Sequence, residues 1–171
     1  YAASKLAGET LVYSYSRCYG LPYLVVRLSN VYGRYDNDLQ RMERVIPLFV
    51  EKINRGEPLI LFGGDRVFDF THIDDCVAGI SNGIRLLVEG RVANQTINLA
   101  RGEGHSLRQL CNFLMKSTGI STSIIDAPAQ IGEINRYVAN LDKARELLGY
   151  EPSRSLPNGI DLMLADIRID R

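Results

Sequence analysis

The chain has 171 residues, of which 46% are hydrophobic and 23% are charged. This length predicts a single domain with enough chain to bury a core. The 20 Lys and Arg residues balance the 20 Asp and Glu residues, so no net charge favours binding to nucleic acid or to an anionic membrane. The longest apolar run, at 45–50, is much shorter than the ~18 residues of a membrane span. We therefore expect a cytoplasmic protein without a membrane or nucleic-acid partner.

The cysteines and histidines do not form a pattern that is typical of a metal site. Cys18, Cys76 and Cys111 lie far apart and form no C-x-x-C pair, and His72 and His105 have no ligand-like partners. We therefore expect no metal. The odd number of cysteines indicates free thiols in a reducing compartment.

The first third of the chain predicts a helix, a buried strand, a polar loop and a second helix. The helix at 1–19 ends at Gly20, a residue suited to the left-handed conformation that closes a helix. Residues 23–28 are almost continuously apolar, which is typical of a strand covered on both faces in a parallel sheet. A polar loop at 29–42 follows, and the apolar spacing at 43–55 predicts the second helix.

Two short strands and a helix come next. Residues 59–62 and 66–72 are predicted strands, and the glycine-rich turn at 63–65 indicates a hairpin between them. Asp74 follows the second strand and is the expected N-cap of a helix at 75–89.

The rest of the chain continues to alternate between strands and helices. Ser106 and Ser155 stand where helices are expected to begin, and Gly149 stands where one is expected to end. The predicted elements are a strand at 96–100, a helix at 107–118, a strand at 122–126, a helix at 140–149 and a helix at 156–169. This alternation predicts an α/β fold.

Tyr1 and Lys5 are the first candidates for chemistry, because residues four apart on a helix share one face. A phenol is a poor base at neutral pH, and a fixed ammonium beside it stabilises the phenolate. Such a pair can exchange protons with a sugar hydroxyl. On spacing alone, a solvated lysine on an amphipathic helix is the simpler interpretation. The choice between this interpretation and a catalytic pair therefore depends on the rest of the sequence.

Four sequence blocks provide that pattern. They are YAASKLAGE from Tyr1, RLSNVYG from Arg27, FGGDRVFDFTHIDD from Phe62 and GEINRYVANLDKARELLGYEP from Gly132. In this order and spacing the chain resembles the extended short-chain dehydrogenase/reductase superfamily, in its NAD-dependent nucleotide-sugar epimerase/dehydratase branch, which includes UDP-glucose 4-epimerase. The resemblance covers almost the whole chain.

The resemblance implies that residues 1–171 are the C-terminal portion of an epimerase/dehydratase domain. The expected fold is the C-terminal part of a Rossmann-type doubly wound sheet together with the small mixed α/β substrate-binding domain. The N-terminal dinucleotide-binding half, with its glycine-rich phosphate turn, is expected to be absent. Gly102 and Gly104 do not replace it, because the third glycine of G-x-G-x-x-G is missing.

The same resemblance assigns roles to residues near the start of the chain. It implies that Tyr1 is the catalytic acid/base and that Lys5 is its partner, which also binds the nicotinamide ribose of NAD. Ser29 falls where family members meet the nicotinamide through the backbone. Asn30 falls where the substrate diphosphate is bound, and an amide donor suits that anion. A loop residue that bonds its own backbone is the alternative for Asn30.

A second group matches positions that hold the nucleotide. Val45 and the run Ile60, Leu61 and Phe62 match the positions that bind the base, with backbone amides reading a pyrimidine and the Phe62 ring packing on it. Glu133 stands where the family has Asp, which contacts the ribose hydroxyls. Core packing is the alternative for the apolar members of this group.

One position departs from the family pattern. The strand after the turn normally carries an Arg that binds the substrate phosphates, and here that position is Phe68. Side chains alternate along a strand, so Arg66 and Phe68 are expected to point the same way, roughly 6.6 Å apart. Arg66 is therefore a candidate replacement. Alternatively, Arg66 is a solvated hairpin residue and the phosphate charge is met by Arg44 or Arg136.

The resemblance implies a nucleotide-sugar 4-epimerase that works through NAD-mediated oxidation and reduction at sugar C4. A UDP-sugar is the expected substrate, and the full-length protein is expected to be a homodimer. Residues 1–171 by themselves are expected to be inactive. A 4,6-dehydratase or a decarboxylase begins with the same oxidation and stays an alternative. A non-catalytic dinucleotide-binding sensor is a third, although a sensor has no need of Tyr1 and Lys5.

Overall fold

A computed structural model describes residues 1–36, 44–129 and 132–169, with side chains up to 166. Helices and strands alternate along these residues, as the sequence predicts. In chain order they are α1 (Ala2–Tyr19), β1 (Leu24–Leu28), β2 (Asn30–Tyr32), α2 (Val45–Arg55), β3 (Leu59–Phe62), β4 (Val67–His72), α3 (Ile73–Val88), β5 (Gln95–Leu99), β6 (Gly104–Ser106), α4 (Leu107–Thr118), β7 (Ile124–Ala127), α5 (Asp142–Leu148) and α6 (Leu156–Ile169).

The strands form three small sheets that are mostly parallel. β1 pairs with β5 from Leu24 opposite Gln95 to Leu28 opposite Leu99. β4 is the centre of a second sheet, parallel to β2 and antiparallel to β6. β3 and β7 form the third sheet, which is also parallel. The predicted α/β class with parallel pairing is therefore confirmed.

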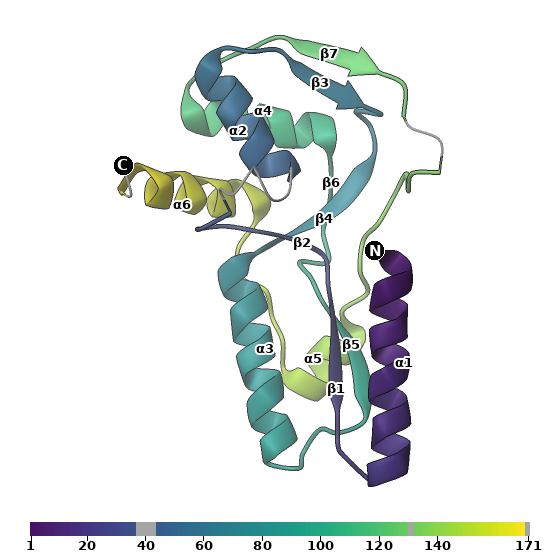
Figure 1. The fold of residues 1–171 in the computed structure, drawn as a ribbon. Helices are drawn as coiled ribbons and strands as arrows, with labels where there is room; N and C mark the ends of the chain where they lie inside the picture. The colour runs from purple at the N-terminus through teal and green to yellow at the C-terminus, as the bar shows by residue number, and fades with distance from the viewer. Residues whose placement is uncertain (37–43, 130–131, 170–171) are drawn as a thin grey trace.

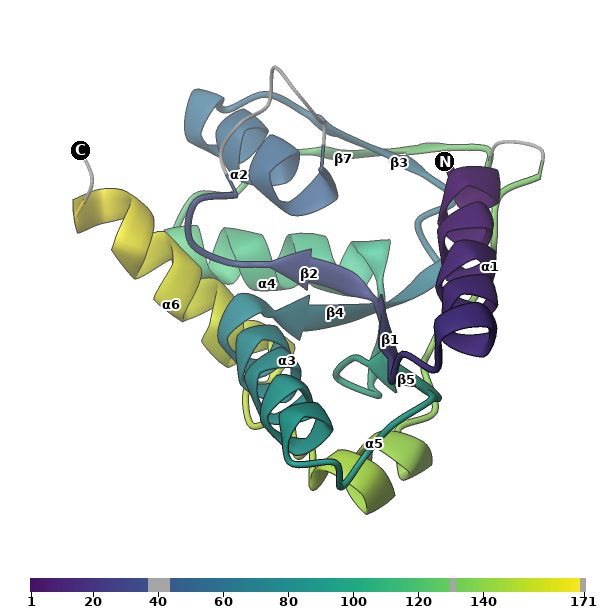
Figure 2. The ribbon, with the colours of Figure 1, turned by 60° about the horizontal axis from the view of Figure 1, so that its bottom comes forward.

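The molecule has two packed regions, joined by β2 and β4 (Figure 1). In the lower region α1, α3 and α5 surround β1 and β5, and in the upper region α2 and α4 lie beside β3, with α6 packed against α4. Figure 2 shows β2 and β4 side by side between these regions. Each region has its own apolar core: Ile97, Leu99 and Leu148 belong to the lower one, and Leu110 and Ile160 to the upper one.

Local signals in the sequence define several helix ends correctly. Gly20 closes α1 with φ of 66°, a left-handed conformation that glycine adopts without steric penalty. The Ser106 hydroxyl accepts a hydrogen bond from the Gln109 backbone N–H at 3.1 Å, and the Gln109 side chain accepts from the Ser106 backbone N–H at 2.8 Å. This reciprocal capping box fixes the start of α4.

The structure corrects two predictions about the central elements. Residues 59–62 and 66–72 do not form a hairpin, because β3 pairs with β7 while β4 pairs with β2 and β6. The N-cap of α3 is His72, whose Nδ1 accepts a hydrogen bond from the backbone N–H of Asp74 at 3.3 Å; Asp74 itself lies inside the helix.

The structure contains two short strands that the sequence pattern did not predict. The predicted loop at 29–42 contains β2, while 37–43 lie outside the described residues. The segment around Gly104 forms β6. Both strands are three residues long, which is too short for an alternating pattern to be visible.

Candidate active site

A large open pocket lies where α1, the β1–β2 segment and the start of α2 approach one another. Its volume is about 1080 Å³, which is enough for a ligand larger than a simple sugar. Tyr1, Lys5, Ser29, Asn30 and Val45 all line it. The pocket therefore brings together five of the residues to which the resemblance assigns roles, from three separate segments of the chain.

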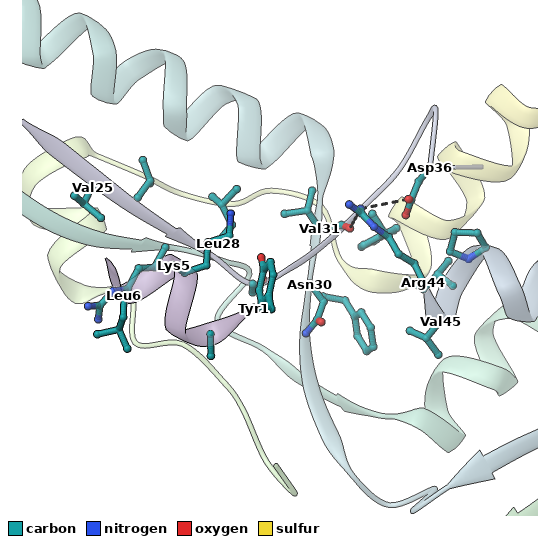
Figure 3. A pocket seen from close by; sticks show the side chains of 18 of the residues that line it. Tyr1, Lys5, Leu6, Val25, Leu28, Asn30, Val31, Asp36, Arg44 and Val45 are labelled. Atoms are coloured by element: carbon teal, nitrogen blue, oxygen red, sulfur yellow. Dashed lines mark hydrogen bonds and ion pairs between the residues drawn. The ribbon is translucent and has the colours of Figure 1, made fainter. Parts of the chain in front are cut away.

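Figure 3 shows how these side chains are arranged. Tyr1 and Asn30 lie near the middle of the view, Lys5 lies on one side and Arg44 and Val45 lie on the other. The pocket therefore has one part that holds the Tyr1 phenol and the Lys5 ammonium, and another part at the start of α2.

Tyr1 and Lys5 share the first turn of α1, as their spacing predicts. The Tyr1 carbonyl accepts a hydrogen bond from the Lys5 backbone N–H at 3.1 Å and another from the Ser4 hydroxyl at 2.7 Å. The Lys5 Nζ lies over the Tyr1 ring, 5.2 Å from its centroid. The Tyr1 residue is 92% exposed, so its phenol can reach a ligand in the pocket.

Ser29 and Asn30 are held in place by the neighbouring strand β4. The Ser29 hydroxyl lies 2.6 Å from the Thr71 hydroxyl. The Asn30 amide nitrogen donates to the backbone carbonyl of Asp69 at 3.1 Å, so Asn30 does not bond its own backbone as in the loop alternative. An amide nitrogen has two N–H donors, and the second can serve a ligand in the pocket.

Arg44 also lines the pocket, and it is one of the two alternatives to Arg66 for meeting the phosphate charge. It stands at the N-cap of α2, where its Nη1 donates to the Val31 carbonyl at 3.3 Å. The same Nη1 lies 3.3 Å from Asp36 Oδ1 (Figure 3). Burial raises the pKa of Asp36, and the Arg44 charge opposes that rise.

The β3 residues lie outside the lining of this pocket. The Leu61 side chain is fully buried (0% exposed) and belongs to the upper core. Ile60 and Phe62 are half-exposed. The N–H groups of Leu59 and Gly63 donate to carbonyls just before β7 and at its end, and alternate residues of a strand face opposite edges. The backbone groups of Ile60 and Phe62 therefore point away from β7, whereas those of Leu61 point towards it and are not available to a ligand.

Arg66 forms a second polar centre with Glu133 at the far end of β4. Its Nη1 donates to Glu133 Oε2 at 2.5 Å, and its Nε donates to the Ile134 carbonyl at 3.1 Å. The guanidinium also lies over the Phe68 ring, 4.9 Å from the centroid, so Arg66 and Phe68 do point the same way. The Arg66 side chain is only 12% exposed, which rules out a solvated hairpin residue.

The pocket around Tyr1 and the Arg66–Glu133 pair are the two polar centres, and one face of β4 connects them. Phe70 lies opposite Asn30 in the register with β2 and lines the pocket. The Phe68 and Phe70 rings are 6.2 Å apart, and Arg66 packs on Phe68. A ligand that reaches both centres would therefore lie along this aromatic face. Arg136, the other alternative, forms a backbone bridge with Val67 beside the same strand.

A network of polar side chains that the sequence did not predict attaches α1 to the sheet. Arg27 donates to Glu9 through Nε at 2.8 Å and through Nη2 at 2.6 Å. The Tyr13 hydroxyl lies 3.1 Å from Glu9 Oε2 and 2.7 Å from the Thr96 hydroxyl. The helical spacing of Tyr1, Glu9 and Tyr13 marks one face of the helix, but nothing local indicates their partners.

Within the described ranges, no helix is long and apolar enough to cross a membrane. No group of three or more metal-ligating side chains occurs among the same residues.

Comparison with known proteins identifies the class to which this fold and site belong. The model of the NAD dependent epimerase/dehydratase family matches residues 1–100. The chain therefore belongs to this family, and the resemblance expected from the four sequence blocks is confirmed.

Individual relatives include both epimerases and dehydratases. An uncharacterized UDP-glucose epimerase, YtcB, of Bacillus subtilis is 29% identical over 94% of this chain and 49% of its own length. A dTDP-glucose 4,6-dehydratase of Streptomyces antibioticus is 32% identical over 94% of this chain and 46% of its own. The chain thus spans about half the length of these curated relatives.

Solved structures give the same result for the fold. The UDP-glucose 4-epimerase of Thermotoga maritima, solved with UDP-glucose, superposes with a TM-score of 0.89 at 30% identity, covering 99% of this chain and 53% of that one. The UDP-glucuronic acid 4-epimerase of Bacillus cereus, solved with UDP-glucuronic acid and NAD, gives 0.87 at 27%, covering 99% and 52%. The α/β architecture is therefore that of nucleotide-sugar epimerases.

Proposed function

We propose that the full-length protein is an NAD-dependent nucleotide-sugar 4-epimerase and that this chain supplies its acid/base pair and most of its substrate site. The observation that carries the proposal is the pocket that Tyr1, Lys5, Ser29 and Asn30 share. A phenol, an ammonium and an amide donor in one pocket suit proton exchange with a sugar hydroxyl next to a bound diphosphate.

The proposed role of Tyr1 is to take the proton of the sugar 4-hydroxyl and later to return it. Lys5 stabilises the phenolate and binds the ribose of the cofactor. Lys5 and Ser29 line the same pocket as Tyr1, and this arrangement fits a nicotinamide ribose. Bound NAD would accept a hydride from C4 and give it back. The ketone would have to turn within the pocket before its reduction, and the large volume allows this.

The nucleotide is proposed to lie along β4 and β3. Asn30 would donate to the diphosphate, and the outward edge of Ile60 and Phe62 would bind the base, while Leu61 would hold the strand in the core. Arg66 and Glu133 would meet the ribose or the adjoining phosphate. A UDP-sugar is the proposed substrate, and a homodimer is the proposed assembly of the full-length protein.

A 4,6-dehydratase is the second candidate, because several relatives carry that name. It shares the first oxidation step, so the acid/base pair of this chain suits both reactions. Analysis of the product distinguishes them, since an epimer keeps the mass of the substrate and a dehydrated keto sugar has lost water.

The test is Tyr1→Phe in the full-length protein, with nucleotide sugars followed by NMR. Loss of a general acid/base typically lowers turnover by about 10²–10⁴, while NAD binding by calorimetry should be nearly unchanged. A variant that kept more than about a tenth of the wild-type turnover would show that another group moves the proton. Wild-type protein that binds NAD without changing any nucleotide sugar would favour the sensor.

A further inference from the structure

Polar contacts attach α1 to the neighbouring sheet. None of its residues is buried, although the helix carries Tyr1 and Lys5 and lies beside β1 in both ribbon views (Figures 1 and 2). The side-chain hydrogen bonds that tie its described residues to the sheet are those of Glu9 with Arg27 and of Tyr13 with Thr96. The Glu9 carboxylate is thus engaged on the same helix that carries Lys5.

Glu9 is also a potential partner of Lys5. The two residues are four apart on the helix, which is a spacing at which Lys and Glu commonly form an ion pair. In the structure, however, both Glu9 oxygens accept hydrogen bonds from Arg27, and Oε2 also accepts one from the Tyr13 hydroxyl. The Lys5 ammonium lies instead over the Tyr1 ring.

We propose that Arg27 is a positioning residue which, by binding the Glu9 carboxylate on both oxygens, prevents Glu9 from pairing with Lys5 and so leaves the ammonium beside Tyr1. The consequence for catalysis rests on the proposed function. A planar guanidinium suits this role, because its fork matches the two oxygens of a carboxylate, whereas an ammonium acts as a point charge. The hydrogen bonds from Arg27 also lower the pKa of Glu9, so the carboxylate stays ionised and attached.

Other charged groups face this part of the pocket. Asp36 and Arg44 lie across it and pair with each other, so neither is an unpaired charge towards Lys5. The Tyr137 phenol lies near Arg27 and interacts with its charge. Glu9 is thus the carboxylate on the helix itself that would be released if Arg27 were removed.

The kinetic test uses Arg27→Met in the full-length protein. If Glu9 then draws Lys5 away, the phenolate loses its cation and the acidic limb of the rate–pH profile moves to higher pH. A shift of about 0.1–0.4 of a pH unit, or a rate about 1.4- to 2.3-fold lower on that limb, follows from the strength of such helix pairs. Adding Glu9→Gln removes the competing carboxylate, so the double variant should regain the wild-type limb. A double variant that is no better than Arg27→Met would overturn the proposal.

A matched control and a conservative variant complete the kinetic experiment. Arg85 on α3 is as exposed as Arg27, at 54%, and also binds a glutamate, Glu89, on both oxygens. Arg85→Met should leave the profile unchanged. Arg27→Lys keeps the charge without the fork, so it should show a smaller shift, and it replaces Arg27→Met if that variant does not fold. A shift with Arg85→Met equal to that with Arg27→Met would contradict a specific role.

A measurement without turnover separates this inference from the proposed function. The Glu9 carboxyl is titrated by NMR in Arg27→Met and in Arg27→Met with Lys5→Met. Glu9 should titrate at a lower pH when Lys5 is present, because the released carboxylate pairs with it. Identical titrations would overturn the inference even in an active enzyme. A clear difference in a protein without epimerase activity would support the exchange and refute the proposed function.

Discussion

Asp75 is the residue whose replacement should most clearly weaken the contact between the two packed regions. It stands in the first turn of α3 and is 5% exposed. Its Oδ1 accepts hydrogen bonds from the Ser153 N–H at 3.1 Å, the Ser153 hydroxyl at 3.0 Å and Arg154 Nη1 at 3.3 Å. Its Oδ2 accepts one from the Arg154 N–H at 3.0 Å. These bonds fix the segment that leads into α6.

The expected effect of Asp75→Asn follows from this geometry. An amide oxygen in the place of Oδ1 keeps three of the bonds, but the NH₂ group then faces the Arg154 N–H, which loses its acceptor. A buried N–H without an acceptor destabilises by about 1–3 kcal/mol. The retained bonds also lose their charge-assisted part, which adds about 1 kcal/mol. The free energy of unfolding should therefore fall by about 2–4 kcal/mol.

The pH dependence provides a second check. Burial alone would raise the pKa of Asp75, but the hydrogen bonds from Arg154 and Ser153 hold it below its usual value of 3.8. The ionised carboxylate therefore stabilises the fold above that value, and this stabilisation is lost as the pH falls through the lower pKa of the folded state. The difference between wild type and Asp75→Asn should shrink on acidification.

Urea denaturation of the full-length protein, followed by circular dichroism at several pH values, measures both effects. Asp161→Asn is the control, because Asp161 is an exposed residue of α6, and it should change the free energy by less than about 0.5 kcal/mol. A loss below that limit in Asp75→Asn, or a loss that is the same at acid and neutral pH, would refute the reasoning.

Three further variants test other parts of the structure. Gly159→Ala should destabilise by about 1–3 kcal/mol in urea unfolding, because the new Cβ would clash with the phenol oxygen of Tyr32 and lie 2.9 Å from its Cζ. Ser106→Ala removes the hydroxyl that caps α4 through Gln109 and should lose about 0.5–2 kcal/mol, measured as a lower urea midpoint. Arg66→Ala should raise the KM for the nucleotide sugar by the equivalent of about 1–3 kcal/mol with little change in kcat; a fall in kcat alone would contradict a binding role.

The sequence by itself determined the features that depend on neighbours within one or two turns. Tyr1 and Lys5 share a face because residues four apart meet on any helix. Gly20 closes α1 and Ser106 opens α4 because their side chains, or the lack of one, act on the adjoining backbone. The ordered motifs also indicated the family correctly.

Only the tertiary structure decided which distant segments meet. β3 pairs with β7, more than 60 residues away, rather than with the adjacent β4. Arg66 binds Glu133, 67 residues later, and Arg27 binds Glu9 on a different element. Such partners depend on how all the apolar faces are buried together, and the apolar pattern of one strand does not specify which of several similar strands will cover its edge. The pocket around Tyr1 is therefore a product of the whole fold.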